Sequence, residues 1–163
     1  MTSSTRDVVT NTSPLLYLHQ LGLIDLLPQI FQRLVVPSAV IAELAEGQGL
    51  GYDVPSPSAF AWVEIAPPVV PITQAPTGLG PGEREAIALA VTRRSDLILL
   101  DDGLARRYAS GLGLAVTGTL GVILRAKQRG HLAAVSPVLD RLTGLGSRLA
   151  AETRAGVVKL ADE

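Results

Sequence analysis

Short apolar runs alternate with longer segments of helical periodicity along most of the chain. Five of these runs have the length and the residue types of β-strands. They cover residues 8–10, 34–36, 61–65, 97–100 and 114–116. Strands that alternate with helices in this order are typical of a parallel sheet covered by helices. The pattern therefore predicts an α/β fold.

Start and stop signals place the helices between and after these strands. Ser13 and Pro14 supply an N-cap and a first-turn proline for a helix that runs through Leu21. Two Gly- and Pro-rich stretches, 47–58 and 66–82, are predicted surface loops. The other predicted helices cover residues 24–31, 39–46, 82–94, 104–110 and 118–129, and two more begin at Ser136 and after Ala150.

Length and composition limit the class of protein. The chain has 163 residues, and we expect one domain over residues 1–163 with a core of its own. Cysteine is absent, which excludes a disulfide scaffold, a thiol nucleophile and a thiolate zinc site. The first residues lack the apolar segment of a signal peptide, and no apolar run reaches membrane-spanning length without Gly, Pro or charge. We therefore expect a soluble, cytoplasmic protein.

The formal net charge of −1 conceals an uneven distribution. Residues 1–103 hold five Arg and eleven acidic residues, whereas residues 104–163 hold nine Lys or Arg and four acidic residues. The basic half could lie along the phosphates of a nucleic acid beside an acidic centre. The same charges also fit ordinary solvated helix faces, because the whole chain is close to neutral.

Two adjacent carboxylates, Asp101 and Asp102, end the predicted strand at 97–100. Two acids in such a place repel each other and lose hydration, so a cation or a dense set of donors usually compensates them. Capping of the following helix is the commoner reason for an acid at such a boundary. From the pair alone, a cap is favoured over a metal site.

Other polar residues also follow predicted strands. Open α/β sheets place their functional clefts at the carboxyl ends of strands, and residues 11–13 and 117–119 occupy such positions. Two acids on predicted helices add to this set. Glu43 lies on the border of an apolar stripe and could turn inward, and Glu83 shares a stripe with apolar residues, whereas Glu85 points roughly the other way.

Five short motifs resemble those of PIN-domain nucleases, in the same order. They are VVTNTSPL at 8–15, VIAEL at 40–44, GEREAIALA at 82–90, LLDD at 99–102 and VTGTLGV at 116–122. No single motif is specific, but five in the right order are hard to explain by chance. The last motif is similar to a prokaryotic PIN subfamily of unassigned function, related to the VapC-type toxins of toxin–antitoxin systems. The resemblance covers nearly the whole chain.

The resemblance implies a three-layer α/β/α sandwich with a parallel sheet of four to five strands. It also implies a metal-dependent endoribonuclease with acidic residues around one or two Mg²⁺ or Mn²⁺ ions, plausibly the toxin of a toxin–antitoxin pair. Carried over motif by motif, the acidic positions of the family fall on Asn11, Glu43, Glu83 and Asp102. Asp101, beside the last, is a further candidate ligand, although within the pair we expect Asp102 to bind the metal and Asp101 to support it or to cap the helix.

The residue types suit this chemistry. Mg²⁺ and Mn²⁺ favour carboxylate oxygens and water, lower the pKa of a bound water and neutralise charge on a phosphate. By this resemblance, Glu43, Glu83 and Asp102 would hold the metal. Glu83 is preferred to Glu85, the second-choice acid, because the family's spacing up to Asp102 then fits without a gap.

The chain departs from the wider family at the first acidic position. Asn11 offers a neutral amide oxygen where most members have a carboxylate, so the cluster loses one negative charge and some metal affinity. Either Asn11 still takes part in a weaker metal site, or the domain keeps the fold and binds RNA or protein without turnover. We expect the enzyme, with a catalytically impaired binding module as the alternative.

The resemblance also indicates partners. We expect RNA as the substrate, a cognate antitoxin that masks the cleft, and a homodimer. The apolar stretches at 15–18 and 24–30 could supply a dimer interface or pack internally. Hydroxyl and guanidinium groups at the cleft edge would contact RNA, although capping is the commoner role for Ser13. These candidates are Ser13, Arg106, Arg107, Thr117 and Thr119.

Overall fold

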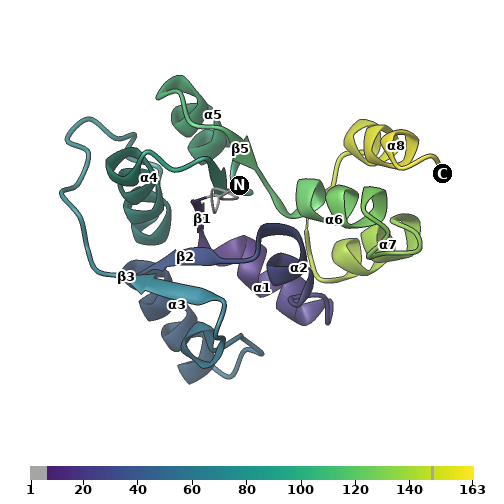
Figure 1. Ribbon diagram of the computed structural model, residues 1–163, viewed down its shortest axis with the longest axis horizontal. Helices are drawn as coiled ribbons and strands as arrows, with labels where there is room; N and C mark the ends of the chain where they lie inside the picture. The colour runs from purple at the N-terminus through teal and green to yellow at the C-terminus, as the bar shows by residue number, and fades with distance from the viewer. Residues whose placement is uncertain (1–6, 148) are drawn as a thin grey trace, which may run out of the picture.

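A parallel sheet forms the centre of the computed structural model, which describes residues 7–147 and 149–163 (Figure 1). Within them the order across the sheet is β3-β2-β1-β4-β5, and every neighbouring pair is parallel. The predicted α/β/α sandwich with four to five strands is therefore confirmed. The strands are β1 (Val8–Thr10), β2 (Leu34–Pro37), β3 (Val63–Ala66), β4 (Leu97–Leu99) and β5 (Val116–Thr117).

Helices follow the strands and cover both faces of the sheet. α4 and α5 lie on one face, whereas α1, α2, α3, α6 and α7 pack on the other, with α8 beside α6 (Figure 1). Among the described residues, no helix combines the length and the apolar character needed to cross a membrane. The helices are α1 (Thr12–Gln20), α2 (Leu26–Phe31), α3 (Ser38–Gly49), α4 (Pro81–Arg93), α5 (Gly103–Gly111), α6 (Thr119–Gln128), α7 (Ser136–Gly144) and α8 (Ala151–Leu160), with a 3-10 turn, η1 (Pro57–Ala59), before β3.

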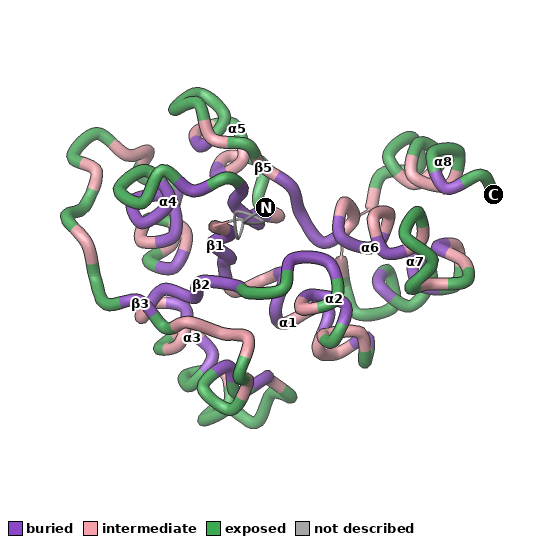
Figure 2. Tube along the Cα trace, viewed as in Figure 1, coloured by how far each residue is buried: buried purple, intermediate pink, exposed green. Residues whose placement is uncertain are grey.

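The sheet separates two apolar cores, because alternate residues of each strand point to opposite faces. Val8, Leu97 and Leu99 belong to the core under α1, α2 and α6, whereas Val9 and Ile98 belong to the core under α4 and α5. Figure 2 shows the buried residues along the strands and on the inward sides of the helices. Burial on both faces explains why the strands are continuous apolar runs in the sequence rather than alternating ones.

Several predicted boundaries differ from the structure by one to three residues, as at α3, which extends to Gly49, and at β5, which begins at Val116. Two of the differences have a clear local cause. α1 begins at Thr12 because Asn11, in an extended conformation, takes the N-cap position, so Ser13 lies inside the first turn and is not the cap. The strand predicted at 61–65 begins at Val63, because the two residues before it form a turn. Neither difference changes the order of the elements.

The strand order defines a switch point between β1 and β4. From β1 the chain moves to β2 and β3 on one side, and then to β4 and β5 on the other. Thr10 pairs with Leu99 in the parallel register of β1 and β4. Asn11 and the acid pair Asp101 and Asp102 therefore leave neighbouring strands at the same edge. Open α/β sheets usually bind ligands at this place.

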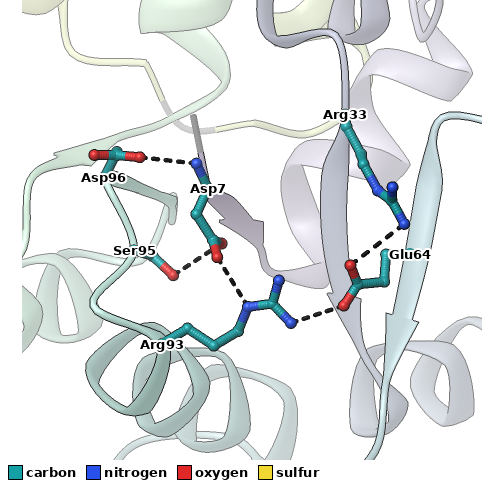
Figure 3. Close-up of polar contacts among 6 residues, drawn as sticks. All are labelled: Asp7, Arg33, Glu64, Arg93, Ser95 and Asp96. Carbon is teal, nitrogen blue, oxygen red and sulfur yellow. Dashed lines mark hydrogen bonds and ion pairs between the residues drawn. The ribbon is translucent and has the colours of Figure 1, made fainter. Parts of the chain in front are cut away.

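An ion-pair network closes the opposite ends of the strands (Figure 3). Arg93, in the last turn of α4, donates to Asp7 at 2.9 Å and to Glu64 at 2.7 Å. Arg33 contacts Glu64 at 3.3 Å, and Ser95 donates to Asp7 at 3.1 Å. Hydrogen bonds to Glu64 and Asp7 raise the pKa of the Arg93 guanidinium. The paired charges join β1, β3 and α4, so this end of the sheet has a structural role.

The apolar stretches considered for a dimer interface contribute mostly to the core. Leu15, Leu18 and Leu27 are fully buried, and Leu26 and Ile30 are nearly so. These side chains pack against the sheet and the helices around it. Internal packing is thus the role of most of both stretches, and the homodimer stays a prediction.

Glu163 joins the end of α8 to α6 and α7. Its carboxylate accepts hydrogen bonds from the backbone N–H of Val135 at 2.6 Å and of Ser136 at 3.2 Å, and from the Ser136 hydroxyl at 3.0 Å. Lys127 Nζ lies 3.2 Å from the same carboxylate. These donors lower the pKa of Glu163 to about 2, chiefly through the N–H of Val135. The charged carboxylate therefore stabilises the start of α7.

We expect Glu163→Gln to lower the Tm at pH 7, because a neutral amide accepts weaker hydrogen bonds from a helix start. The pKa of Glu163 is lower in the folded state than the ordinary value of 4.5. Its contribution to stability is therefore complete above pH 4.5 and is lost as the pH falls toward 2. Circular dichroism melts should show a Tm difference that shrinks over this range.

Glu46→Gln is the matched control, because Glu46 is an exposed residue of α3. It should leave the Tm unchanged. A Tm difference for Glu163→Gln that stayed constant from pH 7 to pH 2 would contradict a role for the ionised carboxylate.

Candidate functional site

Residues from four separate parts of the chain meet at the switch point. Asn11 follows β1, Glu43 lies in α3, Glu83 lies in the first turn of α4, and Asp102 follows β4. The backbone N–H of Asn11 donates to the carbonyl of Leu99 at 3.0 Å, which ties the end of β1 to β4. The charges of Asp102 and Glu43 both contribute to the raised pKa of Glu83. The fold thus places these predicted positions at one edge of the sheet.

Glu43 joins three helices through one carboxylate. Its Oε2 accepts a hydrogen bond from the hydroxyl of Thr12 at the start of α1. Its Oε1 accepts from the backbone N–H of Gly82, at the start of α4, at 2.8 Å. A Cβ at position 82 would lie 2.6 Å from Glu43 Oε2, so only glycine fits there without displacing the carboxylate. The predicted inward turn of Glu43 is confirmed.

Glu83 lies in a crowded acidic environment. Its Oε1 accepts from the backbone N–H of Gly80 at 2.9 Å, which caps the start of α4. Partial burial raises the pKa of Glu83, and the charges of Asp102 and Glu43 add to the rise, whereas the Gly80 N–H opposes it. The net shift is upward. A carboxyl group whose pKa is raised by burial and by neighbouring carboxylates is typical of a functional site.

Asp102 caps α5. Its Oδ2 accepts from the backbone N–H of Ala105 at 3.0 Å, and the residue is exposed. The capping interpretation of the acid pair is therefore confirmed for Asp102. A carboxylate carries about four lone pairs on two oxygens, so one capping bond leaves room for a further ligand.

Asp101 directs its carboxylate at the start of α6. Its Oδ1 and Oδ2 accept from the backbone N–H and the hydroxyl of Thr119, both at 2.7 Å. Burial raises the pKa of Asp101, while the Thr119 bonds and the charge of Arg106 lower it. Arg106 in turn donates to the carbonyl of Leu100 at 2.8 Å. These contacts assign Asp101 to the positioning of α6.

Asn11 carries a buried oxygen with no partner. The residue is 5% exposed, and its Oδ1 has no hydrogen-bond partner in the part of the chain that the structure describes. Leaving a buried acceptor unsatisfied costs about 1–3 kcal/mol. A buried acceptor of this kind binds a water molecule, an ion or a ligand.

Glu85 does not join the acidic group. Its Oε1 accepts from the Ser38 hydroxyl at 2.6 Å and from the backbone N–H of Ala39 at 3.2 Å, so it caps α3. Two residues along a helix correspond to a rotation of about 200°, which turns Glu85 away from the side that Glu83 occupies. Glu85 is therefore bound to the start of α3, whereas the charges of Glu43 and Asp102 act on Glu83.

The candidate RNA contacts line two neighbouring hollows or lie outside them. Ser13 and Thr119 line a hollow of about 330 Å³ that also borders the acid pair. Arg106 and Thr117 line a second hollow of about 280 Å³. Arg107 is exposed on α5.

Three contributions to this region were not predicted. They are the N–H of Gly82 that binds Glu43, the lack of a Cβ at Gly118, which leaves room for Asp101, and the side chain of Tyr17 in the first hollow. A Cβ on Gly118 would lie 2.6 Å from Asp101 Oδ1. A glycine at a helix start is a weak signal of close approach, because other residues cap better there.

A family comparison decides the class of protein. The DUF3368 family model, described as a PIN domain, matches residues 7–163. The chain belongs to the PIN-domain family. PIN domains are usually nucleases, and PIN nucleases generally use divalent metal ions. A search of curated proteins gave no significant match.

The residue types at the site of this PIN domain suit a divalent ion, but the described side chains are not arranged as a coordination shell. Among the residues that the structure describes, no three Asp, Glu or His side chains are already arranged to hold a metal ion. The carboxylates bind helix-start N–H groups instead. Glu43, Glu83 and Asp102 nevertheless offer the hard oxygen donors that Mg²⁺ and Mn²⁺ prefer. An ion beside them would offset their repulsion and could give the Asn11 Oδ1 a partner.

We expect Glu83→Gln to raise the Tm at pH 7 in the absence of metal. The amide keeps an acceptor for Gly80 but removes the charge that burial and the neighbouring carboxylates disfavour. Because the pKa of Glu83 is raised in the folded state, the wild type loses stability as the pH rises through that pKa. The advantage of the variant should therefore be present at pH 7 and disappear as the pH falls and Glu83 becomes protonated.

Glu85→Gln is the matched control on the same helix. Two donors of α3 stabilise the Glu85 carboxylate, so its neutralisation should bring no gain in Tm. Thermal melts between pH 4 and pH 8 would measure both variants. A Glu83→Gln protein no more stable than the wild type at pH 7 would refute repulsion within the acidic group.

Proposed function

We propose that this PIN domain is a metal-dependent endoribonuclease that hydrolyses the phosphodiester bonds of RNA. The observation that carries the proposal is the position of Glu43, Glu83 and Asp102 at the same edge of the sheet, where Glu43 binds the start of α4 and the charges of Glu43 and Asp102 help to raise the pKa of Glu83. Carboxylates that share one site repel one another, which is costly for folding alone and useful for holding a hard ion. Membership of the PIN family supports nuclease chemistry at this place.

Each residue of the site has a role in this proposal. When bound, Mg²⁺ or Mn²⁺ lowers the pKa of a bound water and stabilises the charge that develops on the phosphate. Thr12 and Gly82 fix the carboxylate of Glu43, so its oxygens are oriented before RNA binds. The residues that would hold the ion are Glu43, Glu83, Asp102 and Asn11.

The basic and hydroxyl groups beside the acids would bind the RNA backbone. Arg106 carries a charge next to the cleft, and its bond to the carbonyl of Leu100 fixes the guanidinium near the end of β4. Asp101 keeps α6 in place through Thr119, which orients the start of that helix. The proposed RNA contacts are Ser13, Arg106, Arg107, Thr117 and Thr119.

A second candidate function is a PIN module that binds RNA or a protein without cleaving it. Asn11 favours it, because an amide at the first acidic position weakens the attraction for a cation. The second candidate predicts RNA binding that needs neither Glu83 nor a metal ion. It is distinguished from the first by the cleavage experiment below.

We further propose that the enzyme is the toxin of a type II toxin–antitoxin pair. The support is the similarity of residues 116–122 to a PIN subfamily related to VapC-type toxins. In this proposal the protein acts in the cytoplasm as a homodimer, and a cognate antitoxin masks the acidic cleft.

We expect the purified protein to cleave labelled single-stranded RNA in Mn²⁺ and not in EDTA. Glu83→Gln and Asp102→Asn should each reduce the rate at least ~100-fold, because loss of a metal ligand exceeds the 10–100-fold cost of losing its outer partners. Gel analysis of the products measures the rate. Glu85→Gln should cleave at the wild-type rate, since Glu85 caps α3.

Cleavage that proceeds equally fast in EDTA or with Glu83→Gln would overturn the metal-dependent mechanism. RNA binding by the wild type without any cleavage would favour the binding module.

We expect Asn11→Asp to bind Mn²⁺ about tenfold more tightly, because it adds a negative charge next to the other carboxylates. Isothermal titration calorimetry measures the affinity. The same variant should have a lower Tm without metal, since residue 11 is almost fully buried and its Oδ1 has no hydrogen-bond partner among the described residues. An unchanged affinity for Mn²⁺ in a folded variant would place Asn11 outside the metal site.

A further inference from the structure

We propose that the cavity under the connection between β3 and α4 binds a small apolar carboxylate, such as an acid that carries one aromatic ring. The connection covers residues 67–80 and runs beside α4 (Figure 1). The cavity has a volume of about 230 Å³, and this connection, α4 and Tyr108 of α5 line it. Its described lining residues do not include Glu43, Glu83 or Asp102, so it is a second site outside the acidic group.

The connection forms a fixed wall of this cavity. A connection of this length without helix or strand is uncommon in a compact domain, and is usually either functional or a linker. Its sequence, PPVVPITQAPTGLG, is rich in proline, which restricts the backbone before any ligand binds. Arg84, on α4, donates to the carbonyl of Leu79 at 3.1 Å and to the carbonyl of Pro76 at 2.8 Å. These bonds tie the end of the connection to α4, so the cavity exists without a ligand.

The walls of the cavity are mostly apolar. Ile87 and Ala88 of α4 are buried, whereas Val69 and Ile72 of the connection are only half-buried, although both pack against the core under α4 and α5. A ligand in the cavity would remove this remaining apolar surface from water. An apolar cavity of about 150 Å³ is large enough for benzene. A cavity of about 230 Å³ therefore has room for one ring and a short chain.

The uncompensated charge at the cavity is positive. Arg84 lines it, is exposed, and donates only to two carbonyls, and it forms no ion pair with any residue in the described part of the chain. Glu85 also lines the cavity, but its Oε1 already accepts from the Ser38 hydroxyl and from the N–H of Ala39 at the start of α3. A carboxylate is the group that an arginine binds best at short range. The ligand is therefore expected to carry one.

Tyr108 adds a second polar group to an otherwise apolar wall. The residue is half-buried, and its hydroxyl has no hydrogen-bond partner within residues 7–147 and 149–163. A phenolic O–H can donate to a carboxylate oxygen. An apolar cavity with a few polar groups that fix orientation is the usual composition of a small-molecule site. The aromatic ring of an acid would occupy the apolar part, and its carboxylate would bind Arg84.

The test is an NMR titration of the full chain with hydrocinnamate, and with hydrocinnamyl alcohol as the neutral analogue. We expect hydrocinnamate to shift the backbone amide signals of Ile72, Ala75 and Ala88 saturably, because these residues line the cavity. The alcohol should shift the same signals but bind about tenfold more weakly, because it lacks the charge that Arg84 attracts.

Two variants separate the charge from the cavity. Arg84→Met should bind the acid about tenfold more weakly and the alcohol with the wild-type affinity, so the preference for the acid disappears. Ala75→Trp should bind neither ligand, because the indole fills the cavity from the connection. Gln74→Trp is the matched control, since Gln74 is an exposed neighbour that does not line the cavity. It should bind both ligands like the wild type.

Three results would overturn the proposal. The first is the absence of saturable shifts at these signals when hydrocinnamate is added to the wild type. The second is wild-type affinity for both ligands in Ala75→Trp, which would place the binding elsewhere. The third is equal affinity of the wild type for acid and alcohol, or a preference for the acid that Arg84→Met retains. None of these results bears on metal-dependent cleavage of RNA.

Discussion

Backbone N–H groups at the starts of helices hold the carboxylates at the carboxyl-end edge of the sheet in this PIN domain. An α-helix leaves its first N–H groups without partners inside the helix and carries partial positive charge at that end. In a parallel sheet each strand runs into a helix at the same edge, so these donors gather there. They hold carboxylates that would otherwise repel one another. The carboxylate and donor pairs are Glu43 with Gly82, Glu83 with Gly80, Asp102 with Ala105, and Asp101 with Thr119.

The acidic residues at the two ends of the sheet are stabilised in different ways. At the amino ends, Arg93 and Arg33 pair with Asp7 and Glu64, so charge is neutralised by side chains of opposite sign. At the carboxyl ends, neutral N–H groups orient the acids without cancelling their charge, and the pKa of Glu83 stays raised. The ion pairs at the amino ends of the strands therefore stabilise the fold. The uncancelled negative charge at the carboxyl ends lowers stability and attracts cations.

Local pattern was enough to predict the fold and part of the site. Strands buried on both faces produce continuous apolar runs, and helical periodicity was enough to predict that Glu83 and Glu85 point in different directions. The N-cap of α1 was missed because Ser13 and Asn11 are both good capping residues, and tertiary contacts decide between them. Contacts between residues distant in the sequence, such as Gly82 with Glu43, leave almost no trace in a single sequence.

The glycine at position 82 affects how α3 and α4 are spaced. Because Glu43 binds the first turn of α4 and Glu85 binds the start of α3, these contacts set the distance between α3 and α4, and the long connection between β3 and α4 does not. That connection can then change in length or sequence without altering the spacing of the acids. Loops tolerate such changes far better than packed helices do. The outer surface of the domain is free to diversify while the interior of the site stays constant.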